Sequence, residues 1–465
     1  MGFAMKKASY LAVLAISTCL SSCMTSFGIN FDLITGGTYE YKVPTRVENA
    51  FEGEIALATT EGKTLSEVRL SQGKHVLPSL GKATVLVLPI SFLGSSFGPS
   101  FQSDLAHALN GAAKDTQYYE SVTSFYQKSS YGKCQLQFEI APVYFTPHSP
   151  ESALTSTDTS QGEDKGAYFV QQAYAKYLEG KNKEELARFD ANGDGVLDAV
   201  MGVYSCRDSK LAQYANDPLQ YFGAYTSWVN PDESLPMPMS CYSWLSYDYL
   251  YRYADLSSPA VDAHFFIREV GHMYGLESYG KYVGGLDNAD GGTLDHNAFS
   301  KLILGWAKPI VAKGKGSLNL NASIIDGECL LLLSSASGAM NPFGEYILIE
   351  YYSPFGLNAR DAGRSYDGSP KGYGRSGVKI YHVDARLEQT EYPVLHLMES
   401  NKTNTFEKDG KASDATLFAS GYTFDIATFG ESFFPKKTTM NNGEGFPYRI
   451  HIDSLGAASC RLSVE

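Results

Sequence analysis

The sequence predicts a mixed α and β protein, with an α+β domain over residues 81–308 and an all-β, sandwich-like C-terminal domain over residues 309–465. Two observations lead to this fold class. Before residue 309, short apolar runs of strand length alternate with segments of helical periodicity, whereas only strand-like segments rich in β-branched residues follow. At the start of the chain, short alternating pieces broken by glycine predict a small β-rich N-terminal region within residues 23–80.

The first 23 residues have the layout of a secretory signal. Two lysines precede an apolar run over residues 8–20, which is shorter than the ~20 residues needed to span a bilayer. The following Leu20-Ser21-Ser22-Cys23 resembles a bacterial lipobox, which implies that residues 1–22 are removed and Cys23 is acylated. We therefore expect a lipid-anchored protein of the bacterial cell envelope, outside the cytoplasm. An ordinary signal peptide with an incidental cysteine is the alternative.

Composition and charge exclude several classes of protein. Of the 465 residues, 43% are apolar and 19% charged, as in ordinary globular proteins and unlike disordered chains. The 38 basic and 51 acidic residues give a net charge of −13, and removal of Lys6 and Lys7 with the signal leaves 36 basic residues and −15. Nucleic acids and anionic lipids require a basic surface, so we expect neither as the main partner. The N-terminal lipid alone would hold the protein to a membrane.

The predicted α+β domain begins with the apolar run 83–88, which has the character of a strand buried on both faces. Helical periodicity follows over residues 103–113 and 167–178, and the segment between them, 146–165, is rich in Ser, Thr, Pro and acids and predicts an exposed loop. A second apolar strand is expected over residues 197–204.

Two further helices precede the change to strands. Ser257-Ser258-Pro259 predicts a helix start, with a capping hydroxyl and a proline in the first turn, and Gly275 predicts its end. Another helix fits residues 297–306. In the C-terminal domain, three segments have the length and β-branched content of strands: 346–350, 378–381 and 448–452.

The first of these helices carries most of a zinc-peptidase motif. Such a helix needs two histidines at i and i+4 as metal ligands, with a glutamate at i+1 as general base. The segment from Phe266 to Leu276 has Glu269, His272 and Gly275 in the expected positions.

Five segments together resemble the immune inhibitor A family of secreted bacterial zinc metallopeptidases. The resemblance extends over residues 81–465. The segments that carry it are Ser124–Lys133, Phe189–Asp198, Asp295–Trp306, Glu345–Tyr351 and Gly377–Asp384. The resemblance implies a zincin fold for the α+β domain and membership of a hydrolase family.

The metal site itself departs from that family in three places. Arg268 stands where the resemblance implies the first zinc-ligand histidine, Ser278 stands at the third ligand position, and Asp287-Asn288-Ala289 replaces the family's Asp-Met-Met. A protonated guanidinium has no lone pair for a metal. His272 with Glu269 makes a poor site, since catalytic zinc takes three protein ligands. The resemblance therefore implies that Glu269 is a vestigial general base, and zinc in the three-ligand form is not expected.

Two ways of rebuilding the site remain open. Glu277, one position from the third-ligand slot, and His296 could supply substitute ligands, whereas His264 lies about 12 Å from His272 along the helix. The other possibility is replacement, in which Arg268 forms an ion pair with an acid of the former site, because a buried carboxylate without its metal would be costly.

A candidate calcium loop lies just before the second strand. Gly195 occupies the turn, and polar side chains alternate as in the opening of a calcium-binding loop: Asp190, Asn192, Asp194 and Asp198. Position twelve is Met201 instead of a bidentate glutamate, so the EF-hand pattern is incomplete. Calcium is possible, and a turn held by Asx hydrogen bonds is the alternative.

Cysteine usage leaves the redox state open. Cys206 and Cys241 flank an aromatic-rich insertion and are the candidate disulfide, with buried thiols as the alternative. His382, near an acid in its strand, is interpreted as a packed structural histidine.

Three functions fit these observations. The first is an envelope lipoprotein with a degenerate peptidase centre and a retained cleft for a peptide or protein. The second is an active zinc endopeptidase with a non-standard ligand set, and the third is a surface adhesin or structural protein.

Overall fold

The computed structural model describes most of the chain from residue 43 onward and contains two β-sheets. The predicted signal, Cys23 and the Ser257-Ser258-Pro259 helix start lie outside the described residues. The described ranges are 43–57, 62–111, 119–155, 165–206, 223–251, 261–291, 294–334, 340–363, 372–404, 414–431 and 433–465. Within them, no helix has the length and apolar character needed to cross a membrane.

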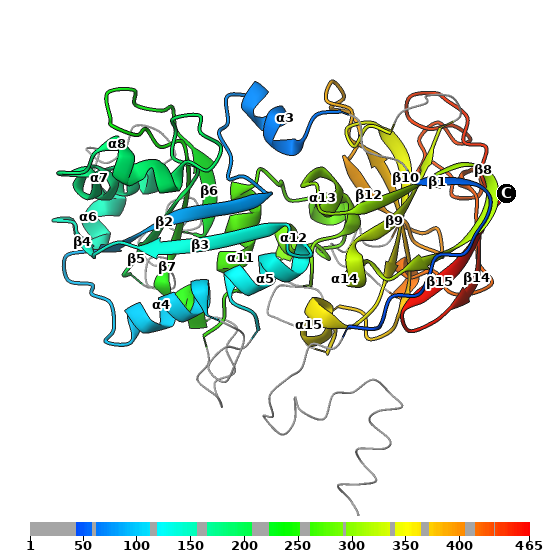
Figure 1. Ribbon diagram of the computed structural model, residues 1–465, viewed down its shortest axis with the longest axis horizontal. Helices are drawn as coiled ribbons and strands as arrows, with labels where there is room; N and C mark the ends of the chain where they lie inside the picture. The colour runs from blue at the N-terminus through cyan, green and yellow to red at the C-terminus, as the bar shows by residue number, and fades with distance from the viewer. Residues whose placement is uncertain are drawn as a thin grey trace, which may run out of the picture.

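The first sheet has the order β3-β2-β5-β7-β6, with β4 paired to the end of β2 (Figure 1). Its pairs are parallel except for the antiparallel edge strand β6. The strands are β2 (Gly81–Ser91), β3 (Cys134–Ile140), β4 (Tyr144–Phe145), β5 (Val200–Tyr204), β6 (Tyr225–Trp228) and β7 (Cys241–Ser246). The central position of β2 and its buried run confirm the strand predicted from residues 83–88.

Helices cover both faces of this sheet. Side chains alternate between the two faces along each strand, so each buried strand packs against helices on both sides. Val85 and Val87 pack into the core formed with α4, α5 and α11, whereas Leu86 and Leu88 pack into the core formed with α7. The helices of this half are α4 (Phe101–Asn110), α5 (Val122–Ser129), α6 (Pro150–Thr155), α7 (Lys165–Leu178), α8 (Lys183–Leu186), α11 (His264–Met273), α12 (Asn288–Gly291) and α13 (Ala298–Ile303). The predictions of α4, α7 and α13 are thereby confirmed, with ends shifted by a few residues. The motif helix is confirmed as α11, but it begins at His264, after the non-helical residues 261–263, and not at Ser257-Ser258-Pro259.

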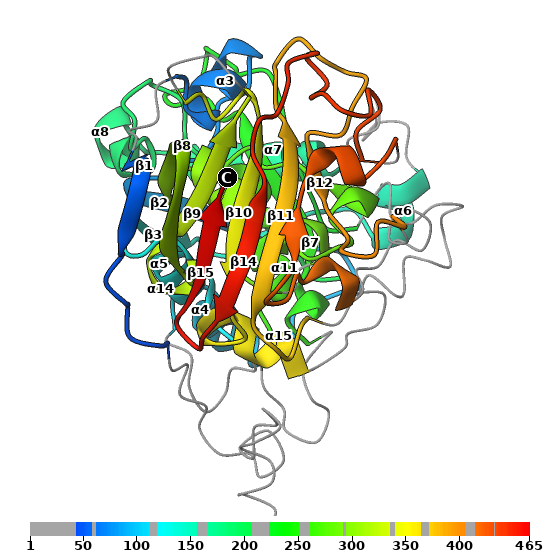
Figure 2. The same ribbon diagram turned by 90° about the vertical axis from the view of Figure 1, so that its right-hand side faces the viewer.

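The second sheet has nine strands in the order β12-β11-β10-β9-β8-β15-β14-β13, and β1 also pairs with β8. The long strand β8 pairs through its first half with β9 and through its second half with β15. Figure 2 shows β14 and β15 lying in front of β9, β10 and β11, so the sheet folds over itself at β8. The strands are β1 (Phe51–Leu57), β8 (Lys308–Asn321), β9 (Glu328–Leu333), β10 (Glu345–Tyr352), β11 (Gly377–Asp384), β12 (Leu395–Leu397), β13 (Thr423–Phe424), β14 (Ile450–Leu455) and β15 (Ser459–Val464).

The β-rich character of the C-terminal part is confirmed, and the strands predicted at 346–350, 378–381 and 448–452 correspond to β10, β11 and β14. Every residue of β10 and β11 is buried, as expected for strands between two layers. Short helices interrupt the strands at α14 (Ser323–Asp326) and α15 (Ala359–Gly363). One hydrophobic core runs from the α11 side of the first sheet into the second sheet, so the two halves pack directly on each other.

The N-terminal region differs from its prediction as a small β-rich unit. Its one strand among the described residues, β1, is part of the C-terminal sheet, and its other element is the helix α3 (Leu65–Ser71). Thr64 and Glu67 form a capping box at the start of α3, and Leu65 and Val68 are buried. Figure 1 shows α3 above the junction between the two halves.

Candidate functional site

Helix α11 carries the motif residues and lies against the edge of the first sheet, where it contacts β6 and β7. Its apolar residues Phe266, Ile267 and Val270 are fully buried. The helix ends before Gly275, which has a φ of +89° that only glycine adopts without strain. This turn brings the segment from Leu276 to Ser278 back toward the helix and makes one wall of a pocket.

Arg268 and Glu269 form an ion pair, as the replacement hypothesis predicted. Arg268 Nη1 lies 2.7 Å from Glu269 Oε1. The Glu269 side chain is 0% exposed, whereas that of Arg268 is 24% exposed and reaches the pocket. Glu269 Oε2 accepts a hydrogen bond of 2.8 Å from the Thr226 hydroxyl on β6. Both carboxylate oxygens of Glu269 are therefore engaged.

His272 lies one turn further along α11 and also lines the pocket. Its Nδ1 donates to the carbonyl oxygen of Leu276 at 2.9 Å. Burial lowers the pKa of His272, and although Glu269 opposes that shift the imidazole is neutral at pH 7. Since Nδ1 carries the proton, Nε2 is left as an acceptor.

The two residues near the third-ligand slot have other partners. The Ser278 hydroxyl donates to the carbonyl oxygen of Ala289 at 3.0 Å. Glu277 forms an ion pair of 2.9 Å with Arg69, a residue of α3, and its side chain is 68% exposed. Neither residue contacts His272.

The histidines considered as substitute ligands are engaged beneath the site. His296 Nδ1 lies 3.0 Å from Asp287 Oδ1, and both side chains are fully buried. His264 lies between two buried carboxylates, those of Asp262 and Asp361, with its Nε2 3.2 Å from Asp361 Oδ2. Burial alone would lower the pKa of His264, but the two aspartates outweigh it and raise this pKa to about 10.

The donor set therefore does not fit a catalytic zinc ion, which takes three protein ligands. Within the part of the chain that the structure describes, no group of three or more His, Cys, Asp or Glu side chains is arranged to hold a metal ion. Of the three positions compared with zinc ligands, only His272 has an imidazole nitrogen to offer, and the adjacent guanidinium of Arg268 would repel a cation.

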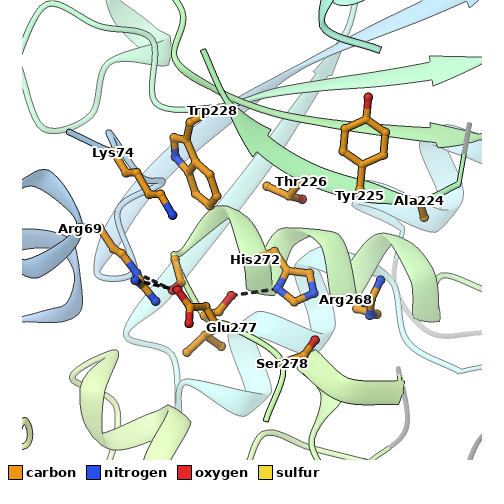
Figure 3. Close-up of a pocket in the computed structure, with 12 residues that line it drawn as sticks. Arg69, Lys74, Ala224, Tyr225, Thr226, Trp228, Arg268, His272, Glu277 and Ser278 are labelled. Atoms are coloured by element: carbon orange, nitrogen blue, oxygen red, sulfur yellow. Dashed lines mark hydrogen bonds and ion pairs between the residues drawn. The ribbon is translucent and has the colours of Figure 1, made fainter. Parts of the chain in front are cut away.

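A pocket of about 300 Å³ opens beside Arg268 and His272 (Figure 3). Figure 3 shows Lys74 and Trp228 on one side, Arg69 with its ion-pair partner below them, and Arg268 across from them. The strand β6 contributes Trp228, whose indole nitrogen donates to the carbonyl oxygen of His75 at 2.7 Å. This hydrogen bond ties the sheet edge to the segment that follows α3.

The sequence predicted the pocket residues on α11 and its following loop, because they share one local motif. It missed the residues that β6 and the α3 region contribute, which are Thr226, Trp228, Arg69 and Lys74. Tyr225–Trp228 lies in the aromatic-rich insertion, which was the one signal available for it.

The loop from Asp190 to Asp198 is closed by its own hydrogen bonds. Asp190 accepts from the backbone N–H groups of Gly193, Asp194 and Gly195 at 2.8, 3.1 and 2.9 Å. Such bonds are those of the Asx turn considered as the alternative. The position-twelve residue Met201 is fully buried in β5.

Asp198 lies behind this loop and accepts from the N–H of Ala191 at 2.8 Å. Burial, together with the charges of Asp190 and Asp194, raises the pKa of Asp198 to about 7. Calcium binding here stays a prediction.

The predicted disulfide between Cys206 and Cys241 is wrong, because the structure keeps both as buried thiols. In the parallel register of β5 and β7, Val200 pairs with Tyr242, which places Cys241 beside Ala199. Cys206 lies seven residues after Ala199, beyond the end of β5, which corresponds to about 23 Å at ~3.3 Å per residue. A disulfide requires Cα atoms within about 7 Å.

His382 has the structural role expected of it. Its Nε2 lies 2.8 Å from Glu345 Oε1, and its ring stacks on Phe434 with the centroids 4.8 Å apart. All of these contacts are buried within the C-terminal half.

A scan against protein-family models gives no match for this chain, and a search of curated proteins gives no significant match. The residues and geometry of the chain define a mixed α and β protein with a cationic pocket at the edge of its first sheet.

Proposed function

We propose that this chain is an envelope-anchored lipoprotein with a metallopeptidase-like, zincin fold whose cleft binds a peptide or protein without hydrolysing it. The observation that carries the proposal is the ion pair of 2.7 Å between Arg268 and Glu269. It occupies the positions at which a zinc peptidase needs a ligand and a free general base.

The chemistry of hydrolysis explains why this pair matters. A zinc peptidase needs a metal-activated water and a carboxylate able to take its proton. Glu269 is fully buried and uses one oxygen for Arg268 and the other for Thr226. Because its side chain has no exposed surface, this carboxylate is out of reach of a water molecule in the pocket and would not take a proton from it.

The architecture around the pair supports retention of a binding cleft. The edge strand β6 lies beside α11, and the pocket is bounded by both elements and by the α3 region. An extended peptide can add to the edge of a sheet, where main-chain hydrogen bonds provide affinity and pockets provide specificity. Three cationic side chains line the pocket, those of Arg69, Lys74 and Arg268, and they attract ligands of negative charge.

The experiment compares metal content, cleavage and binding in one preparation. The protein is purified without added metal, its zinc is measured by mass spectrometry, and casein hydrolysis is followed with and without a chelator. We expect substoichiometric zinc, no cleavage, and retention of unfolded casein on the immobilised protein.

The two other functions predict different results. One zinc per chain, with casein cleavage that is lost on chelation and in Glu269→Gln, would establish the active endopeptidase and refute the proposal. Absence of both cleavage and peptide binding would favour an adhesin or structural protein instead.

A further inference from the structure

We propose that the pocket beside Arg268 is a carboxylate-binding site, which takes the free C-terminus or an acidic side chain of a bound peptide. The inference rests on the proposed function and names the ligand group that the cleft recognises. A zinc ion at this place would polarise a peptide carbonyl. The Arg268 guanidinium would instead pair with a peptide carboxylate.

The charges on the pocket wall favour an anion. Arg69, Lys74 and Arg268 line the pocket, and the one acidic side chain on its wall is Glu277. The pocket lining thus has a formal charge of +2, or +1 when the Glu269 carboxylate behind Arg268 is counted, in a chain whose net charge is −13. A concave site of one charge sign concentrates ligands of the opposite sign. A cationic pocket in an acidic protein therefore selects anions against the field of the whole molecule.

Two of these cations have donors to spare. Arg268 uses one nitrogen for Glu269, and a guanidinium carries five N–H donors in a planar fork that suits a carboxylate. Lys74 lies with Nζ 4.8 Å from the centroid of Trp228, and no described carboxylate lies within 4 Å of it. Figure 3 shows Lys74 and Arg268 on opposite sides of the pocket. A carboxylate that enters the pocket can receive charge-assisted hydrogen bonds from either cation.

His272 adds an acceptor to this set of donors. With Nδ1 bonded to Leu276, the neutral ring offers Nε2 to a ligand N–H. The last residue of a peptide presents both groups close together, since its backbone N–H and its carboxylate flank one Cα. An acidic side chain presents the carboxylate alone. The acceptor therefore favours the C-terminus over a side chain.

The size of the pocket fits a terminal residue better than a long segment. A volume of about 300 Å³ is at the small end of ligand pockets. The ring of Trp228 on its wall provides apolar surface for one side chain. This ring also distinguishes a peptide end from a free inorganic anion, which would leave that surface exposed to water.

The test uses random hexapeptide pools that differ in a single anionic group. One pool has free C-termini, a second is amidated, a third is amidated with one fixed glutamate, and a fourth is amidated with one fixed phosphoserine. All are N-acetylated, and retention on the full-length immobilised protein is measured. We expect the free-acid pool to bind at least about 10-fold more tightly than the amidated pool, with the glutamate pool between them.

Two matched variants locate the effect. Lys74→Met retains the aliphatic contact with Trp228 and removes the charge, and it should reduce the acid-over-amide preference by about 3-fold or more. Lys82→Met makes the same chemical change at the exposed start of β2 and should leave the preference unchanged. Equal loss in both variants would show that net charge, and not this pocket, sets the preference.

The outcomes separate this inference from the proposed function. Equal binding of the acid and amidated pools would overturn the carboxylate site and leave peptide binding intact. Tightest binding of the phosphoserine pool would assign the pocket to phosphate and likewise overturn the inference. Failure of every pool to bind would overturn the inference and the proposed function together.

Discussion

Replacing Arg268 tests whether its charge stabilises the buried carboxylate of Glu269. In Arg268→Met the fully buried carboxylate would retain only the hydrogen bond of 2.8 Å from Thr226. Removing one partner of a buried ion pair costs about 3–5 kcal/mol. Because the Arg268 side chain is 24% exposed, part of its interaction is screened by solvent, and we expect a loss of about 2–3 kcal/mol.

Neutralising Glu269 should reduce the free energy of unfolding by less than replacing Arg268 does. Glu269→Gln removes the charge but keeps one oxygen that can accept from Arg268, while the new NH2 group can donate to the Thr226 hydroxyl, which still donates to the backbone oxygen of residue 269. The remaining guanidinium reaches solvent through the pocket. We expect a loss of about 1 kcal/mol. In the double variant the buried charge is gone, so the two effects should not add, and the coupling energy should be about 1–2 kcal/mol.

Thermal and urea unfolding of the four proteins measure these differences, with Lys82→Met as a control for loss of a cation. A loss of 2–3 kcal/mol should lower the melting temperature by about 2–3 °C, because the unfolding entropy of a chain of this length is about 1 kcal/mol/K. Equal stability of Arg268→Met and the wild type, or a loss in Glu269→Gln as large as that in Arg268→Met, would refute the reasoning. Either result would mean that the carboxylate does not depend on its arginine.

Three further results are expected. Arg268→His with Ser278→Asp should bind one zinc ion per chain by mass spectrometry, whereas Arg268→His alone should not, and the absence of zinc in the double variant would argue against a former metal site. Because the folded-state pKa of His264 is raised to about 10, its stabilisation should be full below pH ~6.5 and lost as pH rises toward 10. The wild-type melting temperature should therefore fall more steeply over this range than that of His264→Gln, and parallel curves would contradict the assignment. Reductant should leave the melting temperature unchanged, and Cys206 and Cys241 should react with alkylating agents only after unfolding.

Features that depend on local sequence were predicted well. The strand β2 was predicted from the apolar run 83–88, which a strand buried on both faces requires. The strands β10 and β11 were predicted from segments of strand length with β-branched residues. The site residues on α11 were predicted because helical spacing alone brings Arg268, Glu269 and His272 to neighbouring positions. The pairing of Arg268 with an acid followed from the cost of burying a carboxylate alone.

Features that depend on contacts between distant segments were not predicted. The pairing of β1 with β8 joins residues more than 250 positions apart, which no local pattern encodes. The helix α3 was mistaken for strand-like alternation, although the capping box of Thr64 and Glu67 was visible in the sequence. Proximity along the chain suggested the wrong disulfide, because the parallel register sets Cys206 and Cys241 far apart.

The position of β15 within its sheet has a consequence for how the protein is made. This strand, residues 459–464, lies between β8 and β14, so it is an internal strand although it follows both of these neighbours along the chain. Until it is available, β8 and β14 each present an unpaired edge, and such edges invite pairing with other chains. The sheet therefore becomes complete only after residue 464 has been synthesised. A nascent or truncated chain lacking these residues should aggregate while its first sheet is already formed.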